Sequence, residues 1–259
     1  MRTKLTIAFT ASALVGGLLS SCYVPQPSFE CFPGGHGYFG DMTLKSSTPN
    51  GGDCDTYTSD SFEIQRYLPP GTSNARIAVM SERMGTTTRL RHGDDRTFVY
   101  LPNPSGKEFA IGPLASVNPD ADGLCKAALT PADQDLPAVT RRTASFPRDG
   151  GVQQLPATKL KYEYQNFRFL NTARFPGTVF NTTLVVTEDT CTATYEVNGV
   201  FDPIFGPAAC ETNADCDPNA NLDAGRIFGS GLSPDIKPVC GRDGVCISSV
   251  PFDDLVKLK

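Results

Sequence analysis

Histidine and tryptophan are the residues this 259-residue chain most conspicuously lacks, because it has two histidines, His36 and His92, and no tryptophan. Two histidines are too few for a three-histidine zinc site, and neither belongs to a His-Glu-x-x-His motif. The formal net charge is −5 without any run of Lys and Arg, so nucleic acid is a poor partner. We therefore expect no metal, no other cofactor and no nucleic-acid partner.

Catalytic motifs are also missing from the sequence. Ser230 in Gly229-Ser230-Gly231 lacks the second spacing of a Gly-x-Ser-x-Gly elbow. Among 28 acidic residues nothing marks the carboxylate pair that glycoside hydrolysis requires. The 16 Phe and 8 Tyr are an ordinary core supply for a β protein, so we expect no exposed platform on which a sugar could stack. The sequence favours a protein that is not an enzyme.

The chain has one long apolar run, Leu5–Leu19, which follows Arg2 and Lys4. A short positive segment followed by an apolar segment too short to span a bilayer is typical of a secretory signal peptide. No second run of this kind occurs, so we expect the rest of the chain to be a soluble body.

The signal ends in Leu19-Ser20-Ser21-Cys22, which resembles the bacterial lipobox. The resemblance implies cleavage before Cys22 and its modification with three acyl chains, which together make a stable membrane anchor. Tyr23, in place of Asp, favours transport to the outer membrane. The alternative is a secreted protein in which Cys22 is coincidental.

Nine cysteines leave eight once Cys22 carries lipid, and an even number in an exported chain predicts four disulfides. The eight cysteines are Cys31, Cys54, Cys125, Cys191, Cys210, Cys216, Cys240 and Cys246. Because short loops are easiest to close, we expect Cys31 to pair with Cys54. Cys191 is expected to point inward, and Cys125 is its expected partner. In the last four we favour Cys210–Cys240 and Cys216–Cys246, with the nested pairing left open.

The 24 Gly and 21 Pro predict many turns and few long helices. We expect a mainly β protein with four parts: a signal peptide (1–21), a lipidated tether (22–30), an antiparallel β-sandwich-like body (31–205) and a small disulfide-rich tail (206–259). The first predicted strands of the body are Phe62–Leu68, Ala75–Met80, Thr86–Leu90, Thr97–Leu101 and Glu108–Ile111. Residues 113–157 have no steady period, and we expect loops there with one helical turn around Cys125–Leu129.

The clearest strand signal is Lys159–Leu170, in which apolar residues alternate and then continue one residue out of phase. A bulge near Gln165-Asn166 would reconcile the two halves. After a break at Pro176-Gly177, we expect a hairpin of Thr182–Thr187 and Cys191–Phe201, with Cys191 facing inward.

The tail carries Cys210-Glu211-Thr212-Asn213-Ala214-Asp215-Cys216, followed by Val239-Cys240 and Val245-Cys246. This pattern resembles the tail of myxobacterial-type surface lipoproteins, and the preceding Cys191–Val200 is similar to a strand of those proteins. The resemblance implies a location at the cell envelope, and it brings no assigned activity.

Two segments have the oxygen-rich spacing of calcium loops. The first contains Asp215, Asp217, Asn219, Asn221 and Asp223. It has Ala220 where an EF-hand needs Gly and Arg226 where it needs Glu, so an Asx-rich turn is the favoured interpretation. The second, Asn118–Gly123, is followed by Lys126, and we rank it lower.

Taken together, the sequence predicts a lipid-anchored protein of the outer membrane with a non-enzymatic binding or structural role. Its partner would be a protein or a polymer of the cell envelope. The alternative is a hydrolase acting on cell-surface polymers, and a narrower one is calcium-stabilised adhesion.

Overall fold

The computed structural model describes residues 30–35, 37–48, 53–92, 107–142, 152–201, 209–224 and 227–258. For residues 89–92, 141–142 and 152–153 it describes the backbone only. The signal peptide, Cys22, His36 and the strand predicted at Thr97–Leu101 lie outside the described residues. Within them, no helix combines the length and the apolar character needed to span a membrane.

The described chain is built mostly of antiparallel β-strands, which confirms the predicted class. The strands are β1 Gly37–Thr48, β2 Ser59–Tyr67, β3 Arg76–Ser81, β4 Ala110–Pro113, β5 Leu124–Lys126, β6 Ala132–Leu136, β7 Val139–Arg142, β8 Val152–Leu155, β9 Thr158–Asn171, β10 Pro176–Glu188, β11 Cys191–Phe201, β12 Pro238–Cys240 and β13 Cys246–Ser248. The helices are α2 Glu82–His92 and α3 Phe252–Val256, with short 3-10 turns η1 Asp53–Asp55, η2 Asn213–Cys216, η3 Leu222–Ala224 and η4 Pro234–Ile236.

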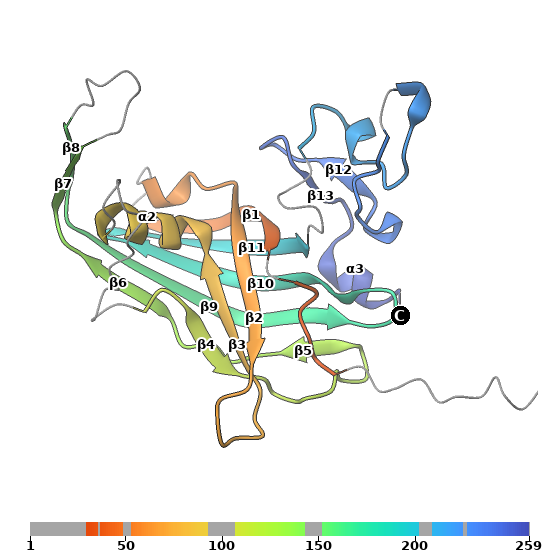
Figure 1. Ribbon diagram of the computed structural model, residues 1–259, viewed down its shortest axis with the longest axis horizontal. Coiled ribbons are helices and arrows are strands. Elements are labelled where there is room, and N and C mark those ends of the chain that lie inside the picture. The colour runs from red at the N-terminus through yellow and green to blue at the C-terminus, as the bar shows by residue number, and fades with distance from the viewer. Residues whose placement is uncertain are drawn as a thin grey trace, which may run out of the picture.

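One large sheet has the order β4-β3-β2-β1-β11-β10-β9-β5, and β6 also pairs with β9. Isolated bridges join Ile111 to Thr130 and Leu114 to Ala127, which link the β4 edge to the segment that carries β5 and β6. The sheet therefore curls until its two halves face each other (Figure 1). The sandwich-like body is in this sense a single continuous sheet.

The interior between the two halves is filled with aromatic side chains. The ring of Phe180 lies 5.4 Å from the ring of Tyr38, 5.4 Å from that of Phe62 and 5.8 Å from that of Phe167. Each of these four residues is at most 2% exposed. Burying large aromatic rings gives a sheet of this size its main stabilisation.

The predicted bulge and hairpin are confirmed. The β9–β10 register shifts where Asn181 pairs with Arg168 but Thr183 pairs with Gln165, and Asn166 takes a positive φ of 54°. The β10–β11 hairpin turns at Asp189, which has a φ of 51°. Asn and Asp are the non-glycine residues that adopt this conformation most readily. Cys191 is buried, as expected.

Two secondary-structure predictions are wrong. Thr86–Leu90 lies in α2 instead of a strand, because the Ser81 hydroxyl accepts the Met84 N–H at the start of the helix (3.3 Å). Thr88 satisfies its own hydroxyl by donating to the Met84 carbonyl oxygen (2.8 Å), which makes a threonine tolerable inside a helix. Residues 113–157, predicted as loops with one helical turn, instead carry four short strands: β5, in place of the turn, and β6 both pair with β9, and β7 pairs with β8. The segment of β5 and β6 has no strong local signal, so its long-range pairing with β9 decides its structure.

The break predicted at Pro176-Gly177 is an irregularity within β10. Gly177 has a φ of 71°, and the register shifts between Pro176 and Val179. A Cβ atom on Gly177 would lie 2.2 Å from the Phe32 carbonyl oxygen, so only glycine fits here.

The body disulfides differ from the predicted pairs, because Cys31 bonds to Cys125 and Cys54 bonds to Cys191. The prediction considered loop length alone and missed β1, which lies between Cys31 and Cys54. Its 12 residues extend roughly 40 Å at about 3.3 Å per residue. Cys31 and Cys54 therefore lie near opposite ends of a strand, far beyond the reach of a disulfide.

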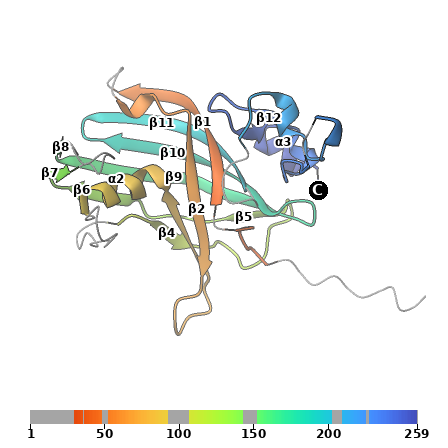
Figure 2. The same cartoon turned by 45° about the horizontal axis from the view of Figure 1, so that its top comes forward.

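The disulfides of the tail join Cys210 to Cys240 and Cys216 to Cys246, the favoured pairing. The tail forms the small β12–β13 sheet and contributes no strand to the large sheet among the described residues. It packs on the body through an apolar cluster that joins Phe175 and Val179 to Ile236 and Phe252. Figure 2 shows the tail beside the large sheet, and its Asp243 accepts the Thr58 hydroxyl (2.9 Å) just before β2. The boundary at residue 205 stays a prediction.

Candidate functional site

The most unusual polar cluster of the described chain lies where β3 ends and α2 begins. Asp60 on β2 accepts hydrogen bonds at one carboxylate oxygen from the Ser61 N–H (2.9 Å) and from the Arg83 N–H (3.3 Å). Its other oxygen accepts the Ser81 hydroxyl. Asp60 thus holds the first turn of α2 against the sheet, where a negative charge is favoured by the helix dipole.

Asp60 has a perturbed acidity. Burial beneath α2 raises the pKa of its carboxyl group to about 6, although the hydrogen bonds from Ser81, Arg83 and Ser61 oppose the shift. The residue keeps partial exposure to solvent, because it also lines a surface cleft. Desolvation therefore outweighs three stabilising donors at this position.

The Arg83 side chain is held beside Asp60 by an aromatic ring. Its guanidinium carbon lies 3.8 Å from the centre of the Tyr57 ring, a close cation–π contact. The Tyr57 hydroxyl donates to Glu188 (2.5 Å), and the Tyr57 N–H donates to the Tyr195 hydroxyl (3.2 Å). Arg83 is therefore positioned by residues from three different strands or loops.

The outer side of this cluster forms a cleft of about 390 Å³. The residues that line it are Phe39, Ser59, Asp60, Ser61, Glu82, Arg83, Thr86 and Thr87. Four of these carry hydroxyl groups, one is aromatic and three are charged. For brevity we call this set the α2 cleft.

On the inner side, two buried tyrosine hydroxyls lack hydrogen-bond partners. Tyr162 and Tyr164 are 1% and 5% exposed, and neither hydroxyl is bonded. The Tyr164 ring lies 6.3 Å from that of Phe62, two residues along β2 from Asp60. Burial raises the pKa of both tyrosines well above the usual value, and the nearby Asp60 charge adds to this. An unbonded buried hydroxyl costs about 1–3 kcal/mol.

The eight cysteines predicted to form disulfides are joined in four bonds. Cys22 and His36 lie outside the described residues, and His92 ends α2 with its side chain undescribed. Ser230 is buried and donates its hydroxyl to the Cys216 carbonyl oxygen (2.9 Å), so it has a structural role in the tail.

The two oxygen-rich segments use their carboxylates to bond their own backbone. In the first, Asp215 accepts the Thr212 N–H (2.8 Å), and Asp217 accepts the Asn219 N–H (2.9 Å). In the second, Asp120 accepts the Leu124 N–H (3.0 Å) and pairs with Lys126 (2.7 Å). Asp217 forms the Asx-type turn favoured for the first segment, and Asp120 forms another by accepting the Asp122 N–H (3.0 Å), whereas the Asp215 bond is one half of a capping box at η2.

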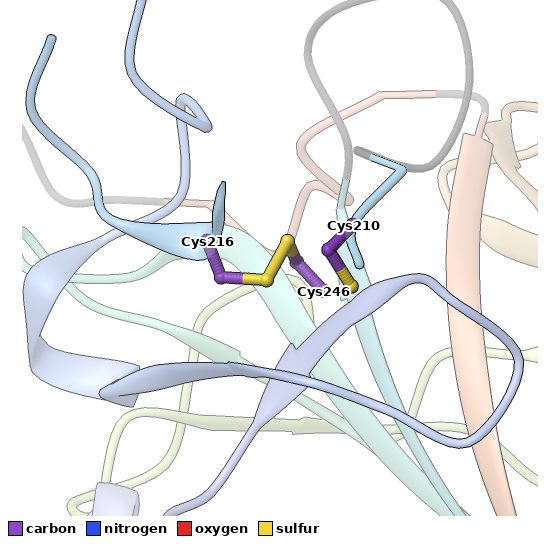
Figure 3. Close-up of side chains that lie close together, drawn as sticks. All are labelled: Cys210, Cys216 and Cys246. Atoms are coloured by element: carbon purple, nitrogen blue, oxygen red, sulfur yellow. A yellow bond between two sulfur atoms is a disulfide. The ribbon is translucent and has the colours of Figure 1, made fainter. Parts of the chain in front are cut away.

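The described part of the chain contains one cluster of at least three His, Cys, Asp or Glu ligand atoms. It consists of Cys210, Cys216 and Cys246, whose sulfur atoms lie within 4.8 Å of one another. Figure 3 shows these side chains and the bond between Cys216 and Cys246. Since Cys210 is bonded to Cys240, all three sulfurs belong to disulfides and none is a thiolate available to a metal.

Sequence reasoning missed the whole α2 cleft. The available signal was Ser81 followed by Glu82, a helix-starting residue before an acidic first turn. Recognising a helix there would have brought Arg83 onto its first turn, next to the end of β3. The unbonded hydroxyls of Tyr162 and Tyr164 left no trace in the sequence, because both residues fit the apolar face of β9.

The chain is 27% identical over 266 residues to a Myxococcus xanthus protein named "Putative lipoprotein MlpA", and the match covers 98% of each chain. No solved structure matches the chain. The family model MlpA matches residues 37–202, which include the large sheet from β1 to β11. The chain belongs to the MlpA family.

Proposed function

We propose that this protein is an outer-membrane lipoprotein, anchored through Cys22, that binds an envelope component at the α2 cleft without cleaving it. The observation that carries the binding role is the engagement of Asp60. Both of its carboxylate oxygens accept hydrogen bonds from the protein itself. A carboxylate whose two oxygens are both hydrogen-bonded makes the cleft rigid. A rigid cleft loses little conformational entropy when a ligand binds, which favours binding.

The lipid anchor is supported by the lipobox-like Leu19-Ser20-Ser21-Cys22 and by the name of the Myxococcus relative. The start of the described chain suits a tether, because it is fixed at a defined point on the sheet. Cys31 is bonded to Cys125 on β5, and Glu30 pairs with Arg66 on β2 (2.8 Å). These two contacts would transmit force from the tether to the large sheet.

A hydrolase of cell-surface polymers is the second candidate, and one observation favours it. A carboxyl pKa of about 6, as at Asp60, is the property that a general acid needs near neutral pH. Against it, general acid catalysis requires a proton directed at substrate, whereas the Asp60 oxygens face Ser61, Ser81 and Arg83. Binding is therefore the better supported function.

The anchoring is tested by treating cells with globomycin, fractionating their membranes and shaving intact cells with protease. We expect the precursor to accumulate under globomycin, and the mature protein to be found in the outer membrane. Cys22→Ala should move the protein into the soluble fraction. Retention of Cys22→Ala in the membrane would contradict the anchor, and retention in the inner membrane would contradict the location.

A further inference from the structure

We infer that the α2 cleft takes a neutral, polyhydroxylated ligand, namely one or two sugar units of an envelope glycan. This inference rests on the proposed binding function and specifies the chemical class of the ligand. Hydrogen-bonding groups, charge and size of the cleft each support it.

Hydroxyl groups dominate the polar lining of the α2 cleft. Ser59 and Ser61 flank Asp60 on β2, and Thr87 faces them from α2. A hydroxyl both donates and accepts, and its proton rotates to suit the partner. Such groups match the hydroxyls of a sugar, which also donate and accept, better than they match a ligand with acceptors alone.

The charged residues of the α2 cleft add directional contacts at its rim. The face of the Arg83 guanidinium lies on Tyr57, which leaves the N–H groups at its edge directed away from that ring. Glu82, the neighbouring residue, is exposed and offers a carboxylate acceptor. Both residues line the α2 cleft, so it offers a charged donor and a charged acceptor to the hydroxyls of a sugar.

The balance of charge excludes other ligand classes. Asp60 and Glu82 outweigh Arg83, so a phosphate or carboxylate ligand would meet net repulsion. A divalent cation would need several free oxygens, whereas those of Asp60 already accept hydrogen bonds. An acyl chain would need an apolar lining, and Phe39, at 9% exposure, is the one aromatic contributor.

The size of the α2 cleft limits the ligand. Its volume of about 390 Å³ lies near the lower end of the roughly 300–1,000 Å³ typical of small-molecule sites. One or two sugar rings would fill such a space. With little aromatic surface available, hydrogen bonds supply the affinity, and a weak, millimolar affinity per sugar unit is expected.

The test is a nuclear magnetic resonance titration of the mature chain carrying Cys22→Ser, with glucose, galactose and N-acetylglucosamine as probes at up to 50 mM. We expect at least one sugar to cause saturable shifts of the Ser61, Arg83 and Thr87 amide signals. Ser61→Ala should weaken that binding about 3- to 10-fold, the effect of one lost neutral hydrogen bond. Ser46→Ala, a matched change at an exposed position of β1 outside the cleft, should leave it unaltered.

Absence of saturable shifts at these amides with all three sugars would overturn the inference. Equal effects of Ser61→Ala and Ser46→Ala would overturn it as well. A second experiment measures whether isolated envelope polymer captures the same chain. It distinguishes failure of the inferred ligand class from failure of the proposed binding function. Polymer capture that is lost on Arg83→Met, without any sugar response, would refute the ligand class alone. No capture and no sugar response would refute both.

Discussion

The Asp60 carboxyl group makes folding stability depend on pH in a defined direction. Its pKa rises from 3.8 in the unfolded chain to about 6 in the folded protein. The folded state therefore binds this proton more tightly than the unfolded state does. Below about pH 4 the Asp60 carboxyl group is protonated in both the folded and the unfolded state, so it does not lower the free energy of unfolding. As pH rises from about 4 to 6 the unfolded chain ionises first, so stability falls, and above pH 6 the loss is complete.

The magnitude follows from the two pKa values. A difference between 3.8 and about 6 corresponds to a loss on the order of 3 kcal/mol, at about 1.4 kcal/mol per pKa unit. Solvent reaches Asp60 through the α2 cleft and reduces the cost of burying its charge. We therefore expect the free energy of unfolding to fall by about 1–3 kcal/mol. Other carboxyl groups also titrate here, and only a comparison with a variant isolates Asp60.

Asp60→Asn is the informative variant. The amide oxygen can still accept the Ser61 and Arg83 N–H groups, and the amide nitrogen can donate to the Ser81 hydroxyl. We expect urea unfolding, followed by circular dichroism between pH 4 and 8, to show that Asp60→Asn matches or exceeds the wild type at pH 7 and loses the pH-dependent decline. Asp135→Asn, at an exposed position of β6, is the control. Identical pH profiles for the wild type and Asp60→Asn would refute the reasoning.

Three further predictions concern the core, the disulfides and the tail. Tyr164→Phe removes an unbonded buried hydroxyl and should therefore raise the free energy of unfolding by about 1–3 kcal/mol in thermal unfolding; a loss of stability would mean that the hydroxyl is hydrogen-bonded. Proteolytic mapping without reduction should recover Cys31 linked to Cys125 and Cys54 linked to Cys191, and a Cys31–Cys54 peptide would contradict the topology. Deleting residues 206–259 should leave a cooperatively folding body with a lower melting temperature, because Phe175 and Val179 lose their cover; a non-cooperative melt would mean that body and tail form a single domain.

The parts of the fold that could be predicted from sequence are those with strong local signals. The alternation in β9 predicted its strand, and its change of phase predicted the bulge at Asn166. For the last four cysteines the sequence favoured the observed pairing but left the nested pairing open. In the body, the disulfides join residues 94 and 137 positions apart. Such pairs depend on how the sheet curls, which loop length does not reveal.

The α2 cleft could not be predicted for a related reason. Its residues come from β1, β2 and α2, and it exists only because α2 crosses the end of the sheet. Thr86, Thr87 and Thr88 are β-branched, and on local propensity they favour a strand. Contacts with Ser81 and Asp60 outweigh that preference by fixing the first turn of the helix.

The most direct test of the account mixes the mature chain carrying Cys22→Ser with isolated peptidoglycan and outer-membrane polysaccharide. Sedimentation measures retention of the protein, and a reducing-sugar assay measures cleavage. We predict that one polymer retains the protein, that Arg83→Met weakens this retention, and that no reducing ends are released over hours. Release of reducing ends by the wild type, abolished in Asp60→Asn, would show a hydrolase and contradict the claim of binding without cleavage.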